Sequence, residues 1–285
     1  MRISIITVTY NAEHTILRTI QSVAGQTHTD VEHLIIDGAS KDTTINIAQS
    51  QGYTPLTQEA SISIPTGASI SKTSPLADNP TLAKHYISQP DKGLYDAMNK
   101  GLHLATGDFL CFLNAGDTLP STDTLAHVAL KAQSPNTALI YGETNIVDDQ
   151  GQYIRPRRLH PTNNMTWHSL KHGMLICHQA FYIRRSIAPD YDLTYRFSAD
   201  FDWCIRCMKE IERRGMRCIH LPEPVANYLN EGMTTANHKA SLKERYSIMA
   251  KHYGLLTTLA MHLWFILRTI LKNNLKSSIQ IHLIL

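Results

Sequence analysis

The sequence is organised around two neighbouring stretches, Pro90-Asp-Lys-Gly-Leu-Tyr-Asp-Ala-Met-Asn-Lys-Gly101 and Gly107-Asp-Phe-Leu-Cys-Phe-Leu-Asn-Ala-Gly-Asp117. Their pattern predicts a loop, a short helix, a buried strand, and polar side chains where that strand ends. Open α/β sheets bind ligands beyond the carboxyl ends of their strands. The placement of Asn114 and Asp117 therefore indicates a ligand site, and this site points to an enzyme.

Strands and helices alternate through the first half of the chain. Apolar, β-branched runs are typical of buried strands, and a 3.6-residue period is typical of the helices between them. This alternation predicts a mainly parallel sheet of the α/β class. The expected strands cover residues 3–8, 31–36, 85–88, 109–113 and 139–141, and the expected helices follow Asn11 and Thr43 or cover residues 94–105 and 125–132.

The second half has a different pattern. A turn near residues 149–151 predicts a hairpin, residues 174–183 a strand, and residues 200–213 an amphipathic helix. Residues 53–82, rich in Ser, Thr and Pro, lack a period and are expected to form a surface insertion. We expect one continuous domain over residues 1–235.

Composition excludes several classes of protein. The chain has 285 residues, 43% hydrophobic and 18% charged, with a net charge of +3. Nucleic-acid binding calls for a concentrated basic stripe, so we expect no nucleic-acid partner. Cys204 and Cys207 lack a second Cys-x-x-Cys pair, which favours a shared buried helix face over a zinc site. Reduced thiols and an N-terminal apolar run too short for a signal peptide lead us to expect a cytoplasmic protein.

The C-terminal residues 236–285 are expected to be helical. Residues 254–271 are apolar, are interrupted by His262 and Arg268, and are flanked by lysines. This pattern favours an amphipathic helix lying peripherally on an anionic membrane surface, on the cytoplasmic face of the inner membrane. Packing against protein and a true membrane span remain open alternatives.

The turn after the first strand excludes two common nucleotide-binding modes. It reads Thr9-Tyr10-Asn11-Ala12-Glu13, without the glycines that dinucleotide-binding folds need, and no P-loop follows.

Three aspartates lie where they could do chemistry. Asp37 ends the second strand and could accept hydrogen bonds from a base or ribose, or could be a turn residue. Asp117 could hold a divalent cation, or could also be a turn residue. Asp200 opens a helix, where it could act as a general base or interact with the helix dipole, the role we expect for Asp202.

Five motifs occur in order: Thr7-Val-Thr-Tyr-Asn11, Asp37-Gly-Ala-Ser-Lys-Asp42, the two stretches quoted first, and Ala199-Asp-Phe-Asp-Trp203. Together they resemble family 2 inverting glycosyltransferases of the GT-A fold, in their bacterial surface-polysaccharide branch. The resemblance covers about residues 2–235 without the insertion. It implies a Rossmann-like, mostly parallel central sheet with a small antiparallel portion on the acceptor side.

The resemblance also implies roles for individual residues. Asp200 matches the catalytic base, Asp117 would hold Mn²⁺ or Mg²⁺ at the diphosphate, and His178 with Gln179 would line the acceptor or phosphate region. Thr9 and Asn11 would line the nucleotide pocket, and Asp37 would contact the base. The residues implied to lie along or near the nucleotide and donor sugar are Asp91, Lys92, Gly93, Asp96 and Asn99.

One motif departs from the family. The family commonly has aspartates at the positions of Asn114 and, often, Gly116. Asn114 can still coordinate or hydrogen-bond, but the resemblance then implies a lower metal affinity.

The implied function is transfer of a sugar from a nucleotide-sugar, a UDP-sugar, to a glycan or lipid-linked acceptor with inversion. Two alternatives stay open. A sugar nucleotidyltransferase uses a related sheet, although its glycine-rich opening loop is missing here. A non-catalytic nucleotide-sugar-binding subunit would explain the missing aspartates.

Overall fold

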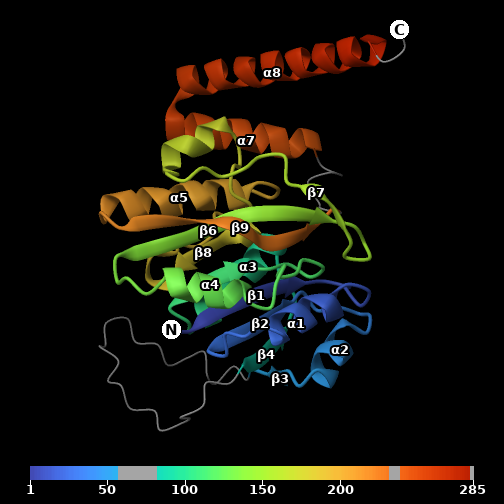
Figure 1. Ribbon diagram of the computed structural model, residues 1–285. Helices are drawn as coiled ribbons and strands as arrows, with labels where there is room; N and C mark the ends of the chain where they lie inside the picture. The colour runs from blue at the N-terminus through green and yellow to red at the C-terminus, as the bar shows by residue number, and fades with distance from the viewer. Residues whose placement is uncertain (57–81, 231–237, 283–285) are drawn as a thin grey trace.

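The computed structural model describes residues 1–56, 82–230 and 238–282, and Figure 1 shows the arrangement of its elements. Most of the expected surface insertion, residues 57–81, lies outside the described residues.

One mixed sheet runs through the described part of the chain, in the order β3-β4-β2-β1-β5-β8-β6-β7 with β9 paired to β6. Strands β3 to β5 in this order are parallel, β8 is antiparallel to both of its neighbours, and β9 runs parallel to β6. The expected mainly parallel α/β sheet with a small antiparallel portion is confirmed. The strands are β1 (Ile3–Thr9), β2 (Val31–Asp37), β3 (Thr54–Pro55), β4 (Ala83–Ser88), β5 (Phe109–Phe112), β6 (Thr137–Val147), β7 (Tyr153–Pro156), β8 (Phe181–Arg184) and β9 (Arg217–Leu229).

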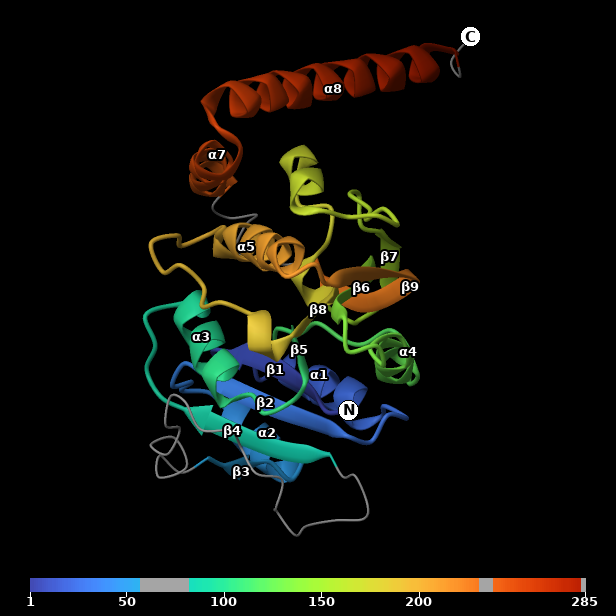
Figure 2. The same ribbon diagram turned by 90° about the vertical axis from the view of Figure 1, so that its left-hand side faces the viewer.

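Helices cover both faces of this sheet, which is why β1 and β2 are buried at every residue. Successive residues of β1 face opposite layers: Ile6 packs in one core with helices α3 and α5, and Ile5 packs in another with α1 and α4. Figure 2 shows the two layers on either side of the strands. The helices of the sheet region are α1 (Ile16–Ala24), α2 (Thr44–Ser50), α3 (Leu94–Leu104), α4 (Thr124–Lys131) and α5 (Ala199–Arg213).

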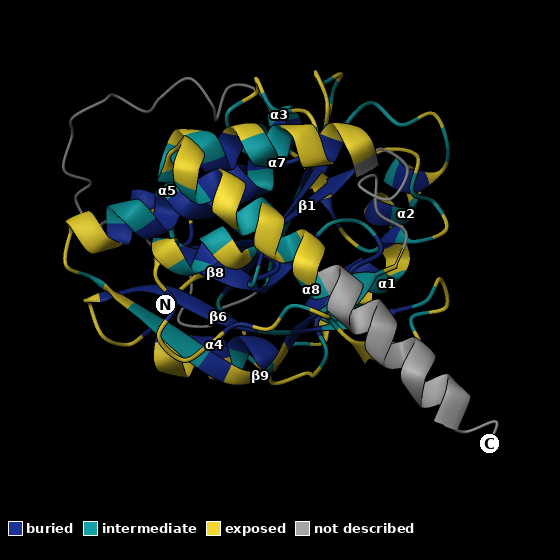
Figure 3. Ribbon diagram, turned by 90° about the horizontal axis from the view of Figure 1, so that it is seen from above, coloured by how far each residue is buried: buried dark blue, intermediate teal, exposed yellow. Residues whose placement is uncertain are grey.

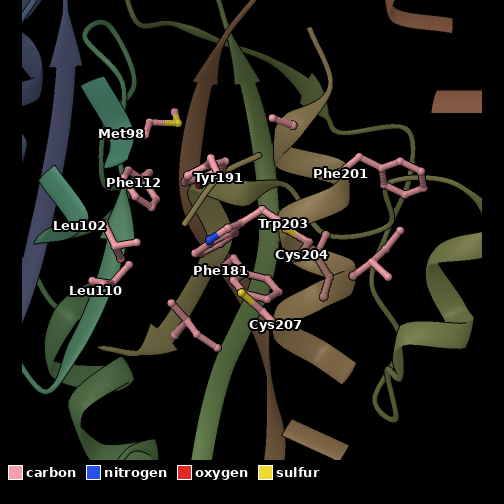
Figure 4. Packing of buried hydrophobic residues seen from close by; sticks show 14 of the residues in the cluster. Met98, Leu102, Leu110, Phe112, Phe181, Tyr191, Phe201, Trp203, Cys204 and Cys207 are labelled. Atoms are coloured by element: carbon pink, nitrogen blue, oxygen red, sulfur yellow. The ribbon is translucent and has the colours of Figure 1, made fainter. Parts of the chain in front are cut away.

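Trp203 is the centre of the core between the sheet and α5. Its ring stacks on Tyr191 at 4.8 Å between centroids and meets Phe112 edge-on at 5.7 Å. Figure 4 shows Trp203 among Phe112, Tyr191 and Phe181. Its indole N–H donates to the carbonyl oxygen of Pro189 at 2.6 Å, so the buried polar end is satisfied. This packing sets the position of the first turn of α5, which carries Asp200.

Two sequence expectations about strands were wrong. The expected strand at residues 174–183 is a strand only from Phe181, and His178–Ala180 forms a 3-10 turn. Strand β9 was not predicted, because its prolines and charged residues mask an extended segment. Three register shifts between β6 and β9 accommodate these residues.

The first helix of the expected C-terminal segment is packed on the domain. Helix α7 (His238–Tyr253) buries Ile248 and Met249 in the core shared with α5. Helix α8 (Leu255–His282) follows at Gly254 and exposes much of its described surface, as Figure 3 shows. Among the described residues, no helix combines the length and hydropathy that crossing a membrane requires.

Candidate active site

A cavity of about 770 Å³ opens where β1 and β5 end, between α3, α5 and α7. Polar groups of two origins line it. We call Thr9, Asn114 and Asp117 the strand-exit wall, because they follow or end β1 and β5. We call His178, Asp200 and Arg245 the helix wall, because a 3-10 turn, α5 and α7 carry them. The other lining residues are Val8, Tyr10, Ala12, Asp91, Gly93, Leu94, Tyr95, Ala97, Ala115, Ile146, Arg157, Met174, Cys177, Gln179, Phe197, Tyr228 and Leu229.

Four buried polar atoms on these two walls have no hydrogen-bond partner among the described residues. They are Thr9 Oγ1, Asn114 Oδ1, His178 Nε2 and Arg245 Nε. A buried polar group without a partner costs about 1–3 kcal/mol. A polar ligand that entered the cavity could satisfy these atoms, so the cavity is suited to a hydrophilic molecule.

Asp200 is the second residue of α5 and lines the cavity as part of the helix wall. Its Oδ2 lies 3.4 Å from His178 Nδ1, and its Oδ1 accepts a hydrogen bond from the Tyr95 hydroxyl at 3.2 Å. Burial raises the pKa of Asp200, but the hydrogen bond and charge of His178 and the charge of Arg245 lower it by more than burial raises it. The net pKa lies below the usual value, so the carboxylate is ionised at neutral pH.

Asp117 lies on the opposite wall and is nearly fully buried. Its carboxylate accepts hydrogen bonds from the backbone N–H of Leu229 and from the Gln179 amide, both at 2.9 Å. Burial raises the pKa of Asp117 to about 6, in spite of these hydrogen bonds and the charge of His178. A raised pKa indicates that the ionised form lacks a compensating positive charge.

The backbone conformation explains why the residue before Asp117 is a glycine. Gly116 has φ +102°, and a Cβ there would come within 2.7 Å of the Leu229 side chain. An aspartate would be strained at this positive φ, and the end of the Leu229 side chain would have to move to make room for it. The departure from the family motif at this position therefore follows from the local backbone.

Asp37 and Asn11 lie beside the cavity but not on its wall. The Asp37 carboxylate is buried and accepts hydrogen bonds from Ser40, through its N–H and hydroxyl, and from the Ser88 hydroxyl at 2.6 Å. Asn11 has φ +48°, and its side-chain oxygen accepts a hydrogen bond from the N–H of Lys41 at 2.9 Å; the N-cap residue of α1 is Thr15. In this structure both side chains tie the loops after β1 and β2 together.

The stretch that leads into α3 also contains both residues that line the cavity and residues that support the backbone around it. Asp91 and Gly93 line the cavity, and Asp91 accepts the N–H of Gly93 at 2.8 Å. Lys92, Asp96 and Asn99 do not line it. Asp96 accepts the N–H of Lys92 at 3.0 Å, and Asn99 exchanges two hydrogen bonds with the backbone of Tyr191.

Sequence reasoning missed several polar residues on the cavity wall, among them Tyr95, Arg157 and Arg245. Tyr95 lies within the quoted stretch, four residues after Asp91, so the motif was an available signal. No local pattern marks Arg157 or Arg245, because each reaches the cavity only through long-range packing.

In residues 1–56, 82–230 and 238–282, no group of three or more His, Cys, Asp or Glu side chains lies close enough together to hold a metal ion.

Comparisons with known proteins agree with this geometry. The chain is 33% identical over 215 residues to a PGL/p-HBAD biosynthesis glycosyltransferase of Mycobacterium bovis, covering 72% of this chain and 68% of the relative. It is 23% identical over 258 residues to the amylovoran biosynthesis glycosyltransferase AmsB of Erwinia amylovora, covering 86% and 75%. The fold is similar to that of TarS from S. aureus, with a TM-score of 0.62 and 14% identity over 93% of this chain and 72% of that one.

The family model of glycosyl transferase family 2 matches residues 4–56 and 78–191. These residues include β1, β2 and β5 and the strand-exit wall. The match spans more than half of the chain, and the Mycobacterium relative covers more than two thirds of it. The chain therefore belongs to glycosyl transferase family 2.

Proposed function

We propose that this chain transfers a sugar, with inversion, from a UDP-sugar to a hydroxyl of a glycan or lipid-linked acceptor in surface polysaccharide biosynthesis. One observation carries the proposal: Asp117 and Asp200, far apart in sequence, line one cavity together with four buried polar atoms that have no partner among the described residues. The structural neighbour TarS has also been solved in complex with UDP-GlcNAc, which supports a UDP-sugar as donor.

Asp200 is the proposed general base. Its lowered pKa keeps it ionised, and its contacts to Tyr95 and His178 hold the carboxylate in one orientation. An acceptor hydroxyl beside Asp200 would lose its proton as its oxygen attacks the anomeric carbon, and the nucleoside diphosphate would leave from the opposite face. Such a base contributes roughly 10²–10⁴-fold to the rate.

Asp117 and Asn114 suit a divalent cation. Both offer oxygen atoms, Asn114 Oδ1 is buried without a described partner, and the raised pKa of Asp117 shows an anion in need of positive charge. Mg²⁺ or Mn²⁺ held there would neutralise charge on the departing diphosphate. Arg157 and Arg245 line the same cavity and supply two further positive charges.

The remaining donor contacts are proposed from their positions. Thr9 Oγ1 faces the cavity without a described partner, and Asp91 and Gly93 line the rim of α3. Asp37 and Asn11 shape the adjacent loops, and contact with the base requires that Asp37 share its carboxylate with Ser40 and Ser88.

The test is a panel of UDP-, GDP- and dTDP-sugars with glycan and lipid-linked acceptors, with and without Mn²⁺. We expect release of UDP and a product whose anomeric configuration, determined by NMR, is inverted. Release of pyrophosphate would identify a nucleotidyltransferase instead, and binding of a nucleotide-sugar without turnover would identify a binding subunit. Retained configuration would contradict the single displacement.

We also propose that α8 lies on the cytoplasmic face of a membrane. Burial lowers the pKa of Arg158, and the charges of Arg268, Arg157 and Arg155 lower it further, which marks a basic cluster beside α8. Basic residues near an anionic surface contribute about 1 kcal/mol each. Among the α8 side chains that the structure describes, the exposed large apolar residues include Leu255, Leu256, Leu259, Leu263, Trp264, Ile266 and Leu267.

Membrane association can be measured by sedimentation with vesicles. Wild-type protein should sediment with vesicles that contain phosphatidylglycerol more than with neutral vesicles, and deletion of residues 254–285 should remove the difference. Unchanged sedimentation of the deleted protein would contradict the proposal. In that case the C-terminal segment, which we propose begins at residue 236, would have no role in membrane binding.

A further inference from the structure

The segment that leads into α5 is held by a side chain from α7. Glu244 accepts hydrogen bonds from three consecutive backbone N–H groups: Arg196 at 2.9 Å, Phe197 at 2.8 Å and Ser198 at 2.9 Å. These residues immediately precede the helix that carries Asp200. One carboxylate thus holds the whole approach to the proposed base.

Helix α5 lacks the usual local cap. Ser198 is its N-cap residue, but the Ser198 side chain makes no capping hydrogen bond and contacts Ser241 of α7 instead. Free N–H groups at a helix start need acceptors. Here Glu244 supplies both carboxylate oxygens to the segment just before that start, a bidentate arrangement that a single amide oxygen cannot reproduce.

A second contact fixes the same turn from the other side. Asp202, fully buried, bonds to His252 of α7 at 2.8 Å and to Arg206 of α5. Helix α7 therefore holds both the segment just before α5 and the first turn of α5, on either side of Asp200 in the sequence.

The contacts of Glu244 reach the cavity through its neighbours. Phe197 and Asp200 both line the cavity, and Arg245, the residue next to Glu244, lines it as well. The Arg245 guanidinium lies 5.9 Å from the Phe201 ring of α5. A shift of Glu244 would therefore move the acceptor side of the cavity and leave the strand-exit wall in place.

We propose that Glu244 is a positioning residue for Asp200, and that α7 is part of the catalytic machinery through it. The inference rests on the proposed sugar transfer. Glu244 does not touch the reacting atoms. It sets the position of the base by holding the backbone of residues 196–198.

The first experiment compares Glu244→Ala and Glu244→Gln with Lys243→Ala, an exposed control on the same helix. Misplacing a catalytic group by about 1 Å can cost ~10²-fold in rate, so we expect kcat to fall about 10²-fold in Glu244→Ala. The loss should be smaller in Glu244→Gln, which keeps one acceptor. The KM for the donor and the Kd for UDP should change much less than kcat, because Thr9, Asn114 and Asp117 keep their positions and Arg245 alone among the charged donor-side groups adjoins Glu244.

Hydrogen exchange supplies a readout that does not need turnover. Amides of residues 196–202 should exchange faster in both Glu244 variants and at the wild-type rate in Lys243→Ala. If wild type shows no transfer, the proposed function fails, while exchange still tests the positioning. Wild-type exchange in both variants would overturn the inference, and so would wild-type kcat.

A double mutant separates positioning from general stability. If Glu244 acts through Asp200, adding Glu244→Ala to Asp200→Asn should cost nothing beyond the single Asp200→Asn change. Multiplied losses would show an independent role and would overturn the proposal. If Glu244→Ala does not fold, Glu244→Gln takes its place in the same cycle.

Discussion

The two walls of the cavity differ in how their residues reach it. The strand-exit wall lies where β1 and β5 end, and these strands pair directly in the sheet, so backbone pairing brings Thr9 and Asn114 to one edge. The helix wall is assembled from a 3-10 turn, α5 and α7, which meet through side-chain packing and polar contacts such as Glu244 with residues 196–198. Backbone pairing therefore positions the first wall, and side-chain packing positions the second.

This difference suggests a division of labour. A wall set by the sheet is rigid and suits binding of the large, charged donor. A wall set by helix packing adjusts more easily to an acceptor, because local stability differs between sheet cores and helices packed at their edge. The predictions below test whether chemistry and binding separate along this line.

The largest effect is expected for the helix wall. Asp200→Asn should lower transfer roughly 10²–10⁴-fold, because the amide cannot take a proton, and should leave UDP affinity within about twofold. Kinetics of UDP release measure the transfer rate, and calorimetry with UDP measures the affinity. Asp117→Asn is the comparison: it should weaken Mn²⁺-dependent UDP binding. Equal loss of binding in both variants would remove the distinction between the walls.

Stability should be lost when the second contact of α7 is broken. The hydrogen bonds and charges of His252, Arg206 and Lys251 outweigh burial and lower the pKa of Asp202, so its stabilising effect is present above the unfolded pKa and lost as pH falls. Asp202→Asn should cost about 2–3 kcal/mol at pH 7, less than a fully buried pair because Lys251 and Arg206 are partly exposed. Denaturant unfolding at pH 7 measures it. A cost that is the same at pH 3 would contradict the ionic origin.

On the strand-exit wall, the effect of Asp117 on the free energy of unfolding should depend on pH in the opposite direction to that of Asp202. The pKa of Asp117 is raised to about 6, so its ionised form destabilises the metal-free protein, and this loss develops as pH rises from about 4 to 6. Asp117→Asn should remove that loss, on the order of 2–3 kcal/mol. Unfolding with EDTA at pH 5 and 7 measures it. If the difference between wild type and variant is independent of pH, the burial of an uncompensated charge is disproved.

The smallest effect is expected at His178. Its hydrogen bond and charge lower the pKa of Asp200, so His178→Gln should raise that pKa and move the acidic limb of kcat/KM to higher pH. At alkaline pH, where Asp200 is ionised in both proteins, the loss should be less than about tenfold. The pH–rate profile measures the limb. If the acidic limb does not shift and kcat/KM falls by the same factor at every pH, His178 acts in binding alone.

The fold class and the family follow from patterns that local sequence carries. Buried strands, amphipathic helices and five ordered motifs predicted a mainly parallel sheet, and the structure and comparisons confirm it. The prediction of a strand at residues 174–183 failed, because a 3-10 turn there depends on contacts with distant residues. The roles assigned to individual site residues remain predictions.

The site shows the same limit. Asp91 and Gly93 line the cavity, but Asp96 and Asn99 of the same motif hold the backbone around it. A motif marks the residues that build a site without separating those that face the ligand from those that support them. Only burial and hydrogen-bond partners make that separation.

The strand ends that carry Thr9, Asn114 and Asp117, and the family motifs, could be recognised in the sequence, because alternation and strand ends are short-range properties of the chain. The strand order and the helix wall depend on the tertiary structure. No local pattern in α7 marks Glu244 or Arg245. Packing brings Glu244 to the backbone of residues 196–198 and places Arg245 on the wall of the cavity that Asp200 also lines. Backbone periodicity carries information along the chain, but which side chains meet across it is decided by how complementary surfaces pack.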